Sequence, residues 1–472
     1  MTSASASPTP TILLPYLPPK TLVGIDLITF TSTPNFYGIR NLPPGWHFLY
    51  TGTTEGLSLR SGGWFYIHPD RNHIKNRGDG MQILVWKWNN NTESLEPVHA
   101  EQQEEGMRIR ANMGALWRGG GLFGYRSRVP STGLVLQRKQ QQKVSEVEED
   151  LDEGEEEGRK EWLGLTEYFS PRLLNRITGE AGAGDVDLDG RPRWVVTSGS
   201  TAKEDDDDIP GIANTTDPTE TATGTATTTT TTTLVTSGTG TVSEKERELS
   251  FLPVDLKMTW REGAIGRERT EAARDRSWAL GDIVQRLSSA DNNSDTSGEA
   301  QILGELQFTF LMGLTVMNYS CLQQWKRLLR LILTCRRAIV DRASFMASVL
   351  RLLLLQLKRS DDVEGGLFDQ LGGEGASEGP EFLHKLLKGF RTALYEEVDA
   401  SELSVVKTEF GHLEAWVKSE FDWELNRDAV LRKGMLQLED GEEVEMEMLA
   451  DEEVDYQPVV VDLDEQSAEE LR

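Results

Sequence analysis

Apolar positions divide the chain into two blocks that have different periods. Between residues 11 and 136, short apolar and aromatic runs such as LVGIDLITF, WHFLY and MQILVWKW are separated by Pro and Gly. Within the last of these runs, Ile83 and Val85 alternate with Leu84 and Trp86, which is the period of a β-strand. Short strands at this spacing predict a β-sandwich-like domain over 11–136, built as an antiparallel sandwich or barrel.

From residue 251 to residue 438, the apolar positions follow the period of an α-helix instead. Leu306 and Phe310 recur at helical spacing in one segment, and Leu322 and Trp325 recur in the next, so we expect Trp325 in the core. Further helices are predicted over about 342–358, 380–397, 401–421 and 423–437. Five or more helices with short connections predict an α-helical bundle or a solenoid-like superhelix.

The remaining segments offer little to bury. We expect an acidic disordered insertion over 137–160, a short helical segment over 161–178, a Thr-rich low-complexity linker over 179–250 and an acidic tail over 439–472. The fold class is therefore predicted to be α+β, with two folded domains and disordered acidic and Thr-rich insertions.

The charge of the chain is concentrated outside the two patterned blocks. Residues 145–157, 204–208 and 439–472 together carry a formal charge equal to the −28 of the whole 472-residue chain. The folded part is therefore close to neutral, which disfavours a protein that binds nucleic acid through bulk positive charge.

Compartment and membrane signals point to a soluble intracellular protein. The N-terminus lacks the basic region of a signal peptide. The uncharged window 306–325 contains four Gln or Asn residues and leads directly into Lys326, which favours a buried helix pair over a membrane span. Two cysteines, Cys321 and Cys335, lie in apolar helical sequence and are expected to be buried core thiols.

Motifs of catalysis are missing from the sequence. It contains no GxxxxGK[ST], HExxH, GxSxG or CxxC motif. The glycine cluster at 118–124 is typical of a turn or bulge rather than a phosphate loop. His68 and His73 with Asp70 form a weak metal pattern in a segment of turn-forming residues, and His47 is expected to be half-buried and structural. We expect no enzyme, no cofactor and no metal site.

Basic residues of the second block leave two interpretations open. They could hold RNA phosphates or an acidic segment, or they could form the solvated face of a helix. The set is Lys326, Arg327, Arg330, Arg336, Arg337 and Arg342.

Two further features suggest binding and its control. The tail run Val459, Val460 and Val461, next to Tyr456, is β-prone and could add a strand to the edge of a partner's sheet, although a chance apolar triplet is the alternative. Ser145 and Ser294 precede acidic residues in predicted loops. Phosphorylation there would add about −2 charge each and could release a partner.

Several strings together resemble a known family. They are LPPKTLVGIDLITF at 17–30, FYGIRNLPPGWHFLY at 36–50, LTEYFSPRLLNRI at 165–177, WREGAIGRERTEAARDRSWAL at 260–280, LGELQFTF at 303–310 and QQWKRLLRL at 323–331. In this order they resemble the AAR-two family, the alpha-one-cistron pre-mRNA splicing factors. The resemblance spans about 11–136, 161–177 and 251–437.

The resemblance implies a fold, a partner and a role. The second domain is expected to be similar to a VHS superhelix. The protein is expected to act without catalysis as an assembly factor of the U5 small nuclear ribonucleoprotein, in the nucleus and cytoplasm. It would bind the RNase H-like and Jab/MPN-like domains of the large U5 scaffold protein and hold off the spliceosomal RNA helicase until phosphorylation triggers exchange. The family's tail strand bridges the two scaffold domains, which gives Tyr456–Asp464 that role.

Further expectations and alternatives complete the sequence-based account. We expect a monomer before binding, with no direct contact to RNA and none to a membrane. The first alternative is a VHS-like adaptor in cytoplasmic trafficking, which rests on fold analogy alone. The second is a hydrolase that uses a pair of carboxylates in a polar cleft, for which no motif argues.

Overall fold

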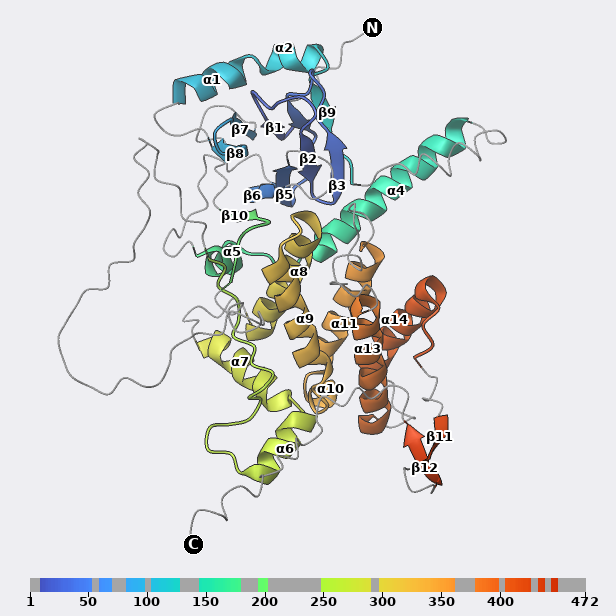
Figure 1. The fold of residues 1–472 in the computed structure, drawn as a ribbon. Helices are drawn as coiled ribbons and strands as arrows, with labels where there is room; N and C mark the ends of the chain where they lie inside the picture. The colour runs from blue at the N-terminus through green and yellow to red at the C-terminus, as the bar shows by residue number, and fades with distance from the viewer. Residues whose placement is uncertain are drawn as a thin grey trace, which may run out of the picture.

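A computed structural model of the chain describes twelve stretches of residues. They are 9–52, 59–69, 82–97, 103–127, 144–179, 194–202, 248–289, 297–360, 378–398, 404–425, 432–437 and 443–448. A mostly-β region lies at one end of the molecule and a helical region at the other, so the predicted two-domain α+β organisation is confirmed (Figure 1).

Two five-stranded sheets form the β region. The first sheet has the order β8-β7-β1-β4-β9 and the second has the order β10-β6-β5-β2-β3. The first sheet contains β1 (Thr11–Leu13), β4 (Gly38–Arg40), β7 (Ile83–Asn89), β8 (Ser94–Pro97) and β9 (Leu122–Gly124). The second contains β2 (Leu22–Ile25), β3 (Ile28–Thr31), β5 (Gly45–Gly52), β6 (Arg60–Ile67) and β10 (Trp194–Thr197). The first sheet is mixed rather than antiparallel, because β7 and β9, which are distant in sequence from their neighbours, pair in parallel with β1 and β4.

Side chains that alternate along β7 enter two different cores, as the sequence pattern predicts. Leu84 and Trp86 join the core between the two sheets. Ile83 and Val85 point to the opposite face, where they pack against helices α1 (Gln103–Ala111) and α2 (Met113–Arg118). Residues 113–118 of the predicted β domain form a helix, α2, and the strand β9 follows it. The glycine cluster lies between them as a turn, with Gly120 in the left-handed region at φ +73°.

Helices form the second region. They are α6 (Gly266–Arg274), α7 (Ser277–Ser289), α8 (Gly298–Thr315), α9 (Tyr319–Leu333), α10 (Ala338–Asp341), α11 (Ala343–Lys358), α13 (Glu378–Glu397) and α14 (Val405–Phe421). The window expected to form a buried helix pair is divided between α8 and α9, which pack against each other. None of the helices in the described ranges has the length and apolar character needed to cross a membrane.

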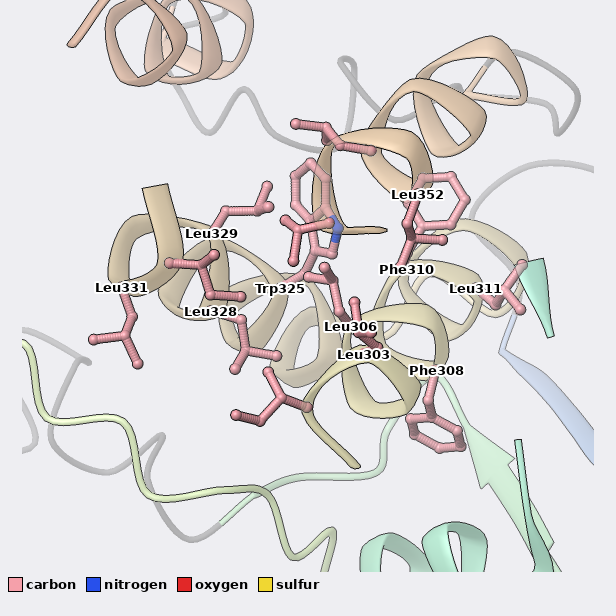
Figure 2. Packing of buried hydrophobic residues seen from close by; sticks show 14 of the residues in the cluster. Leu303, Leu306, Phe308, Phe310, Leu311, Trp325, Leu328, Leu329, Leu331 and Leu352 are labelled. Atoms are coloured by element: carbon pink, nitrogen blue, oxygen red, sulfur yellow. The ribbon is translucent and has the colours of Figure 1, made fainter. Parts of the chain in front are cut away.

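Helix α8 runs through the centre of the molecule and is covered on every side. Every residue from Gln301 to Thr315 is buried. Figure 2 shows Trp325 of α9 on the same side of α8 as Phe310, with Leu352 of α11 nearby, while Phe308 points to the side of the strands. Trp325 is fully buried and its Nε1 donates a hydrogen bond of 3.0 Å to Gln356 Oε1, so its predicted core position is confirmed.

The expected disordered insertion over 137–160 differs from the structure, which contains helix α4 (Val144–Leu165) there. The segment was expected to be disordered because it is acidic, yet Glu and Lys are good helix formers and the run contains no Pro. Glu156 and Lys160 form an ion pair one helical turn apart. The apolar Trp162 and Leu165 anchor the C-terminal end of the helix in the core. The short helical segment predicted over 161–178 thus becomes the end of α4 and helix α5 (Pro171–Thr178).

The expected low-complexity linker over 179–250 also contains ordered structure. Strand β10 pairs antiparallel with β6, and its Trp194 and Val196 are buried. Ala202 forms a parallel bridge with Leu249, so the chain leaves and returns at neighbouring points. The Thr-rich run at 221–233 lies outside the described residues.

A two-stranded hairpin replaces the last helix expected over 423–437. Strand β11 (Arg432–Gln437) pairs antiparallel with β12 (Glu443–Met448), which lies in the expected acidic tail. Helix α14 ends at Phe421, and Asp422 adopts a left-handed conformation as its C-cap. The sequence EVEMEM alternates strictly, which is the period of a strand and not of a helix.

Candidate functional site

An aromatic layer joins the two domains along one face of the second sheet; we call this contact region the seam. Trp64 of β6 lies 4.5 Å, between ring centroids, from Phe169, and Phe169 lies 6.4 Å from Phe308 of α8. Tyr50 of β5 also belongs to this layer, and a Cβ on Gly24 would lie only 2.0 Å from its Cζ atom. The sheet therefore contains glycine where the large ring must cross it.

A buried cation of the first domain binds the end of helix α8. Arg60 is 1% exposed, and its Nη1 donates a hydrogen bond of 2.9 Å to the carbonyl oxygen of Thr315. Thr315 is the last residue of α8, where the helix dipole places partial negative charge. The C-terminal end of α8 therefore helps to compensate the buried positive charge.

Asn318 fastens strand β10 to the turn between α8 and α9. Its Nδ2 donates to the carbonyl oxygens of Thr197, at 2.9 Å, and Ser200, at 2.7 Å. Its Oδ1 accepts from the backbone N–H of Cys321 at 2.8 Å, which caps α9. One side chain thus begins a helix of the second domain and holds the edge strand of the first.

Glu305, on α8, is the most enclosed acid of the seam. Its side chain is fully buried and forms an ion pair of 2.6 Å with Nη1 of Arg176 on α5. It also accepts hydrogen bonds from the backbone N–H of Leu252 at 2.9 Å and from Nε2 of Gln324 at 2.8 Å. This carboxylate connects α5, the returning linker, α8 and α9, and three donors stabilise its charge.

Helices α4 and α5 are tied to both domains. Gln307 of α8 accepts a hydrogen bond from the N–H of Tyr168 and donates one of 2.8 Å to the carbonyl oxygen of Gly164. Trp162 Nε1 donates to the carbonyl oxygen of Trp46 on β5 at 2.7 Å. The two domains are therefore joined through α4 and α5 as well as by direct contact.

The basic set predicted for phosphate or acid binding is largely used inside the domain. Arg336 pairs with Glu396 at 2.6 Å, Arg337 with Asp275 at 3.5 Å and Arg342 with Glu299 at 2.5 Å. Arg330 and Lys326 lie over the ring of Phe382 on α13, 4.8 Å and 6.0 Å from its centroid. The predicted cations therefore have partners within the chain, which favours the interpretation as an ordinary helix surface.

The described part of the helical domain contains a cleft and two buried thiols. The cleft, of about 420 Å³, lies between α7, α8, α10 and α11, and it is lined by Ser277, Glu299 and Arg342 among others. Cys321 and Cys335 are both buried thiols, as predicted. Burial raises the pKa of the Cys335 thiol.

Only some of the other predicted site residues lie within the part of the chain that the structure describes. Tyr456, Val459, Val460, Val461 and Ser294 lie outside the described residues, and so do Asp70 and His73 of the weak metal pattern. Ser145 lies in the first turn of α4 rather than in a loop. His47 is fully buried rather than half-buried, because both faces of β5 are covered. Within the described stretches, no group of three or more His, Cys, Asp or Glu residues is arranged to hold a metal ion.

Sequence reasoning missed the polar residues of the seam. Arg60, Glu305, Gln307 and Asn318 were not singled out. A usable signal was present, because Glu305 and Gln307 interrupt an apolar helical run, and buried polar groups require partners.

The fold and the seam define a class of protein: a two-domain α+β protein whose β-sandwich and helical domain share one continuous core. Residues 8–179 match the AAR2 N-terminal domain, and residues 251–426 match the AAR2 C-terminal repeat region. The chain belongs to the AAR2 family.

Named relatives agree with this assignment. The proteins called "Protein AAR2 homolog" from Homo sapiens and Pongo abelii are each 23% identical to the chain over 352 residues, which is 74% of the chain and 75% of each relative. The homologue from Mus musculus is 24% identical over 350 residues, with the same shares. Family membership supports a role in splicing as a small nuclear ribonucleoprotein assembly factor, and it is consistent with a protein partner and a non-enzymatic role.

Proposed function

We propose that this protein is an assembly chaperone of the U5 small nuclear ribonucleoprotein. It binds the RNase H-like and Jab/MPN-like domains of the large U5 scaffold protein and keeps the spliceosomal RNA helicase away during biogenesis of the particle. The observation that carries this proposal is the match of both domains, in order, to the AAR2 family.

The seam supports a role in which two domains act together. Arg60 and Asn318 fix the sandwich relative to the α8 end, and Glu305 fixes α5 to α8, through buried polar contacts. A partner that contacts both domains therefore meets them in one fixed relative position, so their arrangement needs no ordering on binding.

Exclusion of the helicase needs no chemistry from this chain. Two proteins that bind overlapping surfaces of a third protein exclude each other, so each lowers the apparent affinity of the other. The pairing of Arg336, Arg337 and Arg342 with acids inside the helical domain agrees with a role in which the protein contacts protein rather than RNA.

Several finer points belong to the same proposal. The helical domain is a VHS-like superhelix, and the protein works as a monomer in nucleus and cytoplasm. The segment Tyr456–Asp464 adds a strand that bridges the two scaffold domains. Phosphorylation at Ser145 or Ser294 triggers exchange with the helicase, since about −2 charge is added at each site.

Size-exclusion co-elution tests the proposal with the two scaffold fragments and three forms of the chain. They are the full chain, a truncation after Met448 that retains the β11–β12 hairpin, and a truncation after Glu439 that divides it. Co-elution that weakens with the first truncation supports the strand-bridging tail.

Three other results assign the interface differently or contradict the proposal. Weakening only with the second truncation assigns the contact to the hairpin. Binding unaffected by either truncation assigns it to the folded domains. If the chain forms no complex with either fragment, the proposed function is contradicted and the trafficking adaptor is favoured.

A further inference from the structure

A buried pair of charged residues lies inside the sandwich, away from the seam polar contacts. His47 of β5 is 1% exposed. Its Nδ1 lies 2.8 Å from Asp26 Oδ2, and its Nε2 lies 2.8 Å from the carbonyl oxygen of Pro43. A carbonyl oxygen and an ionised carboxylate are both acceptors, so each ring nitrogen must carry a proton to make these two contacts.

The surroundings of Asp26 decide where the shared proton resides. Asp26 Oδ1 accepts from the backbone N–H of Phe48 at 3.0 Å, and Oδ2 accepts from the hydroxyl of Tyr125 at 2.6 Å. Donors to a carboxylate stabilise its charged form. The proton therefore belongs to the imidazole, and the pair is an imidazolium–carboxylate ion pair enclosed in the domain.

The cluster joins segments that are distant in the sequence. Asp26 lies in the turn between β2 and β3, at φ +56°, and Tyr125 follows β9. Two residues later, Ser127 donates its N–H to Glu155 Oε2 of α4 at 2.7 Å and its hydroxyl to the Glu155 carbonyl oxygen at 2.6 Å. Nη2 of Arg359, which follows α11, donates to the carbonyl oxygen of Ser127 at 3.4 Å. The route from Asp26 to α4 therefore consists of buried or half-buried hydrogen bonds.

We propose that the Asp26–His47 pair is a proton-dependent latch. With His47 protonated, the pair holds Tyr125 against the sandwich and, through Ser127, holds α4 in place. Loss of the His47 proton removes the imidazole donor from either the buried Asp26 carboxylate or the half-buried Pro43 carbonyl. The Asp26 charge then keeps only the Phe48 and Tyr125 donors, without the imidazolium charge beside it. A buried charge that is not compensated is costly, so the segment from β9 to α4 is released.

The charged and titratable groups that face this site come from several elements. Asp26 and Tyr125 contact the imidazole directly, and the Phe65 ring of β6 packs against it at 5.5 Å between centroids. Glu155 and Arg359 act on Tyr125 from the side of α4 and α11. Burial raises the pKa of Tyr125 well above its ordinary value, so Tyr125 stays a donor throughout the range in which His47 titrates.

The sign of the pH dependence follows from the direction of the shift at His47. Burial lowers its pKa, but the Asp26 charge and the hydrogen bonds to Asp26 and Pro43 outweigh burial, and the pKa is raised above 6.5. Such a group stabilises the folded state fully below its unfolded pKa, and this stabilisation is lost as pH rises through the folded pKa. The latch is therefore closed below pH 6.5 and opens as the pH rises through the raised pKa of His47.

Nuclear magnetic resonance of the full chain with labelled histidine tests the protonation state. The chain has six histidines, and His47→Gln identifies the His47 signal. We expect the His47 imidazolium to persist as the pH rises above 6.5, and Asp26→Asn to lower the His47 pKa below its ordinary value. A wild-type His47 that titrates at or below 6.5 overturns the proposal.

Hydrogen exchange tests the latch, with labelling times scaled for the intrinsic effect of pH. When the pH is raised from 6.5 to 9, we expect the backbone amides of residues 122–127 and 155–165 in the wild-type protein to lose at least tenfold of their protection from hydrogen exchange. His47→Gln should show low protection there at both pH values, whereas His412→Gln should behave as wild type.

Two results contradict the latch. One is wild-type protection in these segments that does not change with pH, and the other is an equal alkaline loss in His47→Gln. If His47→Gln fails to fold, the wild-type titration and the wild-type exchange still decide the question, because neither needs the variant.

Discussion

The interior of the sandwich and the seam hold surfaces together in different ways. Between the two sheets, residues such as Ile12, Val23 and Trp86 form an apolar cluster, and the buried Asp26–His47 pair joins segments of the same domain. The seam has an aromatic layer as well, but its buried charges, Arg60 and Glu305, bind groups on other elements across the contact region. Apolar packing tolerates small shifts of one surface against the other. A buried charged or polar group, in contrast, finds its hydrogen-bond partners in only one relative position of the two surfaces.

This difference explains how the relative position of the two domains is fixed. If the sandwich slid along α8 by one turn, Arg60 would lose the Thr315 carbonyl and Asn318 would lose β10. We infer that the apolar layer provides the strength of the seam and the polar contacts provide its alignment.

The largest effect is expected in the helical core. Trp325→Ala should reduce the free energy of unfolding by about 4–5 kcal/mol, because it leaves a large cavity and also removes the partner of Gln356. Chemical denaturation of the full chain measures this effect. Trp325→Phe is the matched control and should lose less, and an alanine variant that unfolds like the wild type would place Trp325 outside the core.

Glu305→Ala should have the second largest effect on stability, a loss of about 3–4 kcal/mol, because the buried Leu252 N–H would lose its acceptor and Arg176 and Gln324 would each lose a partner. Glu271→Gln is the control, since Glu271 pairs with Arg267 on the exposed surface of α6. Equal midpoints of thermal unfolding for the two variants would show that the buried carboxylate does not hold the seam.

Asn318→Ala is expected to have a smaller effect on stability, about 2 kcal/mol, and a specific effect on β10. It removes the cap of α9 and two hydrogen bonds to Thr197 and Ser200. Ser297→Ala removes only a helix cap, that of α8. Hydrogen exchange should therefore rise at 194–202 in the first variant alone, and a rise in both would contradict a seam role for Asn318.

The smallest change in stability is expected from shortening the segment 203–247. Ala202 and Leu249 are paired, so the segment 203–247 begins and ends at neighbouring points. Replacing it with a Gly/Ser linker about eightfold shorter should raise stability by about 1–2 kcal/mol, since each halving of a loop is worth about 0.6 kcal/mol. A large loss of stability on denaturation would mean that the segment contributes to the fold.

The pattern of apolar positions along the chain predicted much of the fold. The alternation in 83–88 predicted both faces of β7, and the helical period around Trp325 predicted the core of the second domain. Acidic composition misled at 137–160, because helix propensity and the buried Trp162 outweigh charge repulsion in α4. Strand β10 is four residues inside a low-complexity stretch, and only its pairing with β6 identifies it.

The seam could not be predicted from one sequence, because its contacts join residues far apart along the chain. Arg60 and Thr315 are separated by 255 positions, and Trp46 and Trp162 by 116. Sequence indicates that Glu305 needs a buried partner, but it does not name Arg176. The position of His47 beside Asp26 depends on the antiparallel pairing of β2 with β5, which the sequence pattern does not specify.

Competition with the helicase is the most direct measurement of the central claim, that this AAR2 family member is an exclusion chaperone for the U5 scaffold protein. The scaffold fragment that contains both the RNase H-like and Jab/MPN-like domains would be saturated with the full chain and then titrated with the helicase. The account predicts that the helicase binds only as this protein dissociates, so its apparent affinity falls in proportion to the concentration of the chain. A stable complex that contains all three proteins, or a scaffold fragment that does not bind the chain, would contradict it.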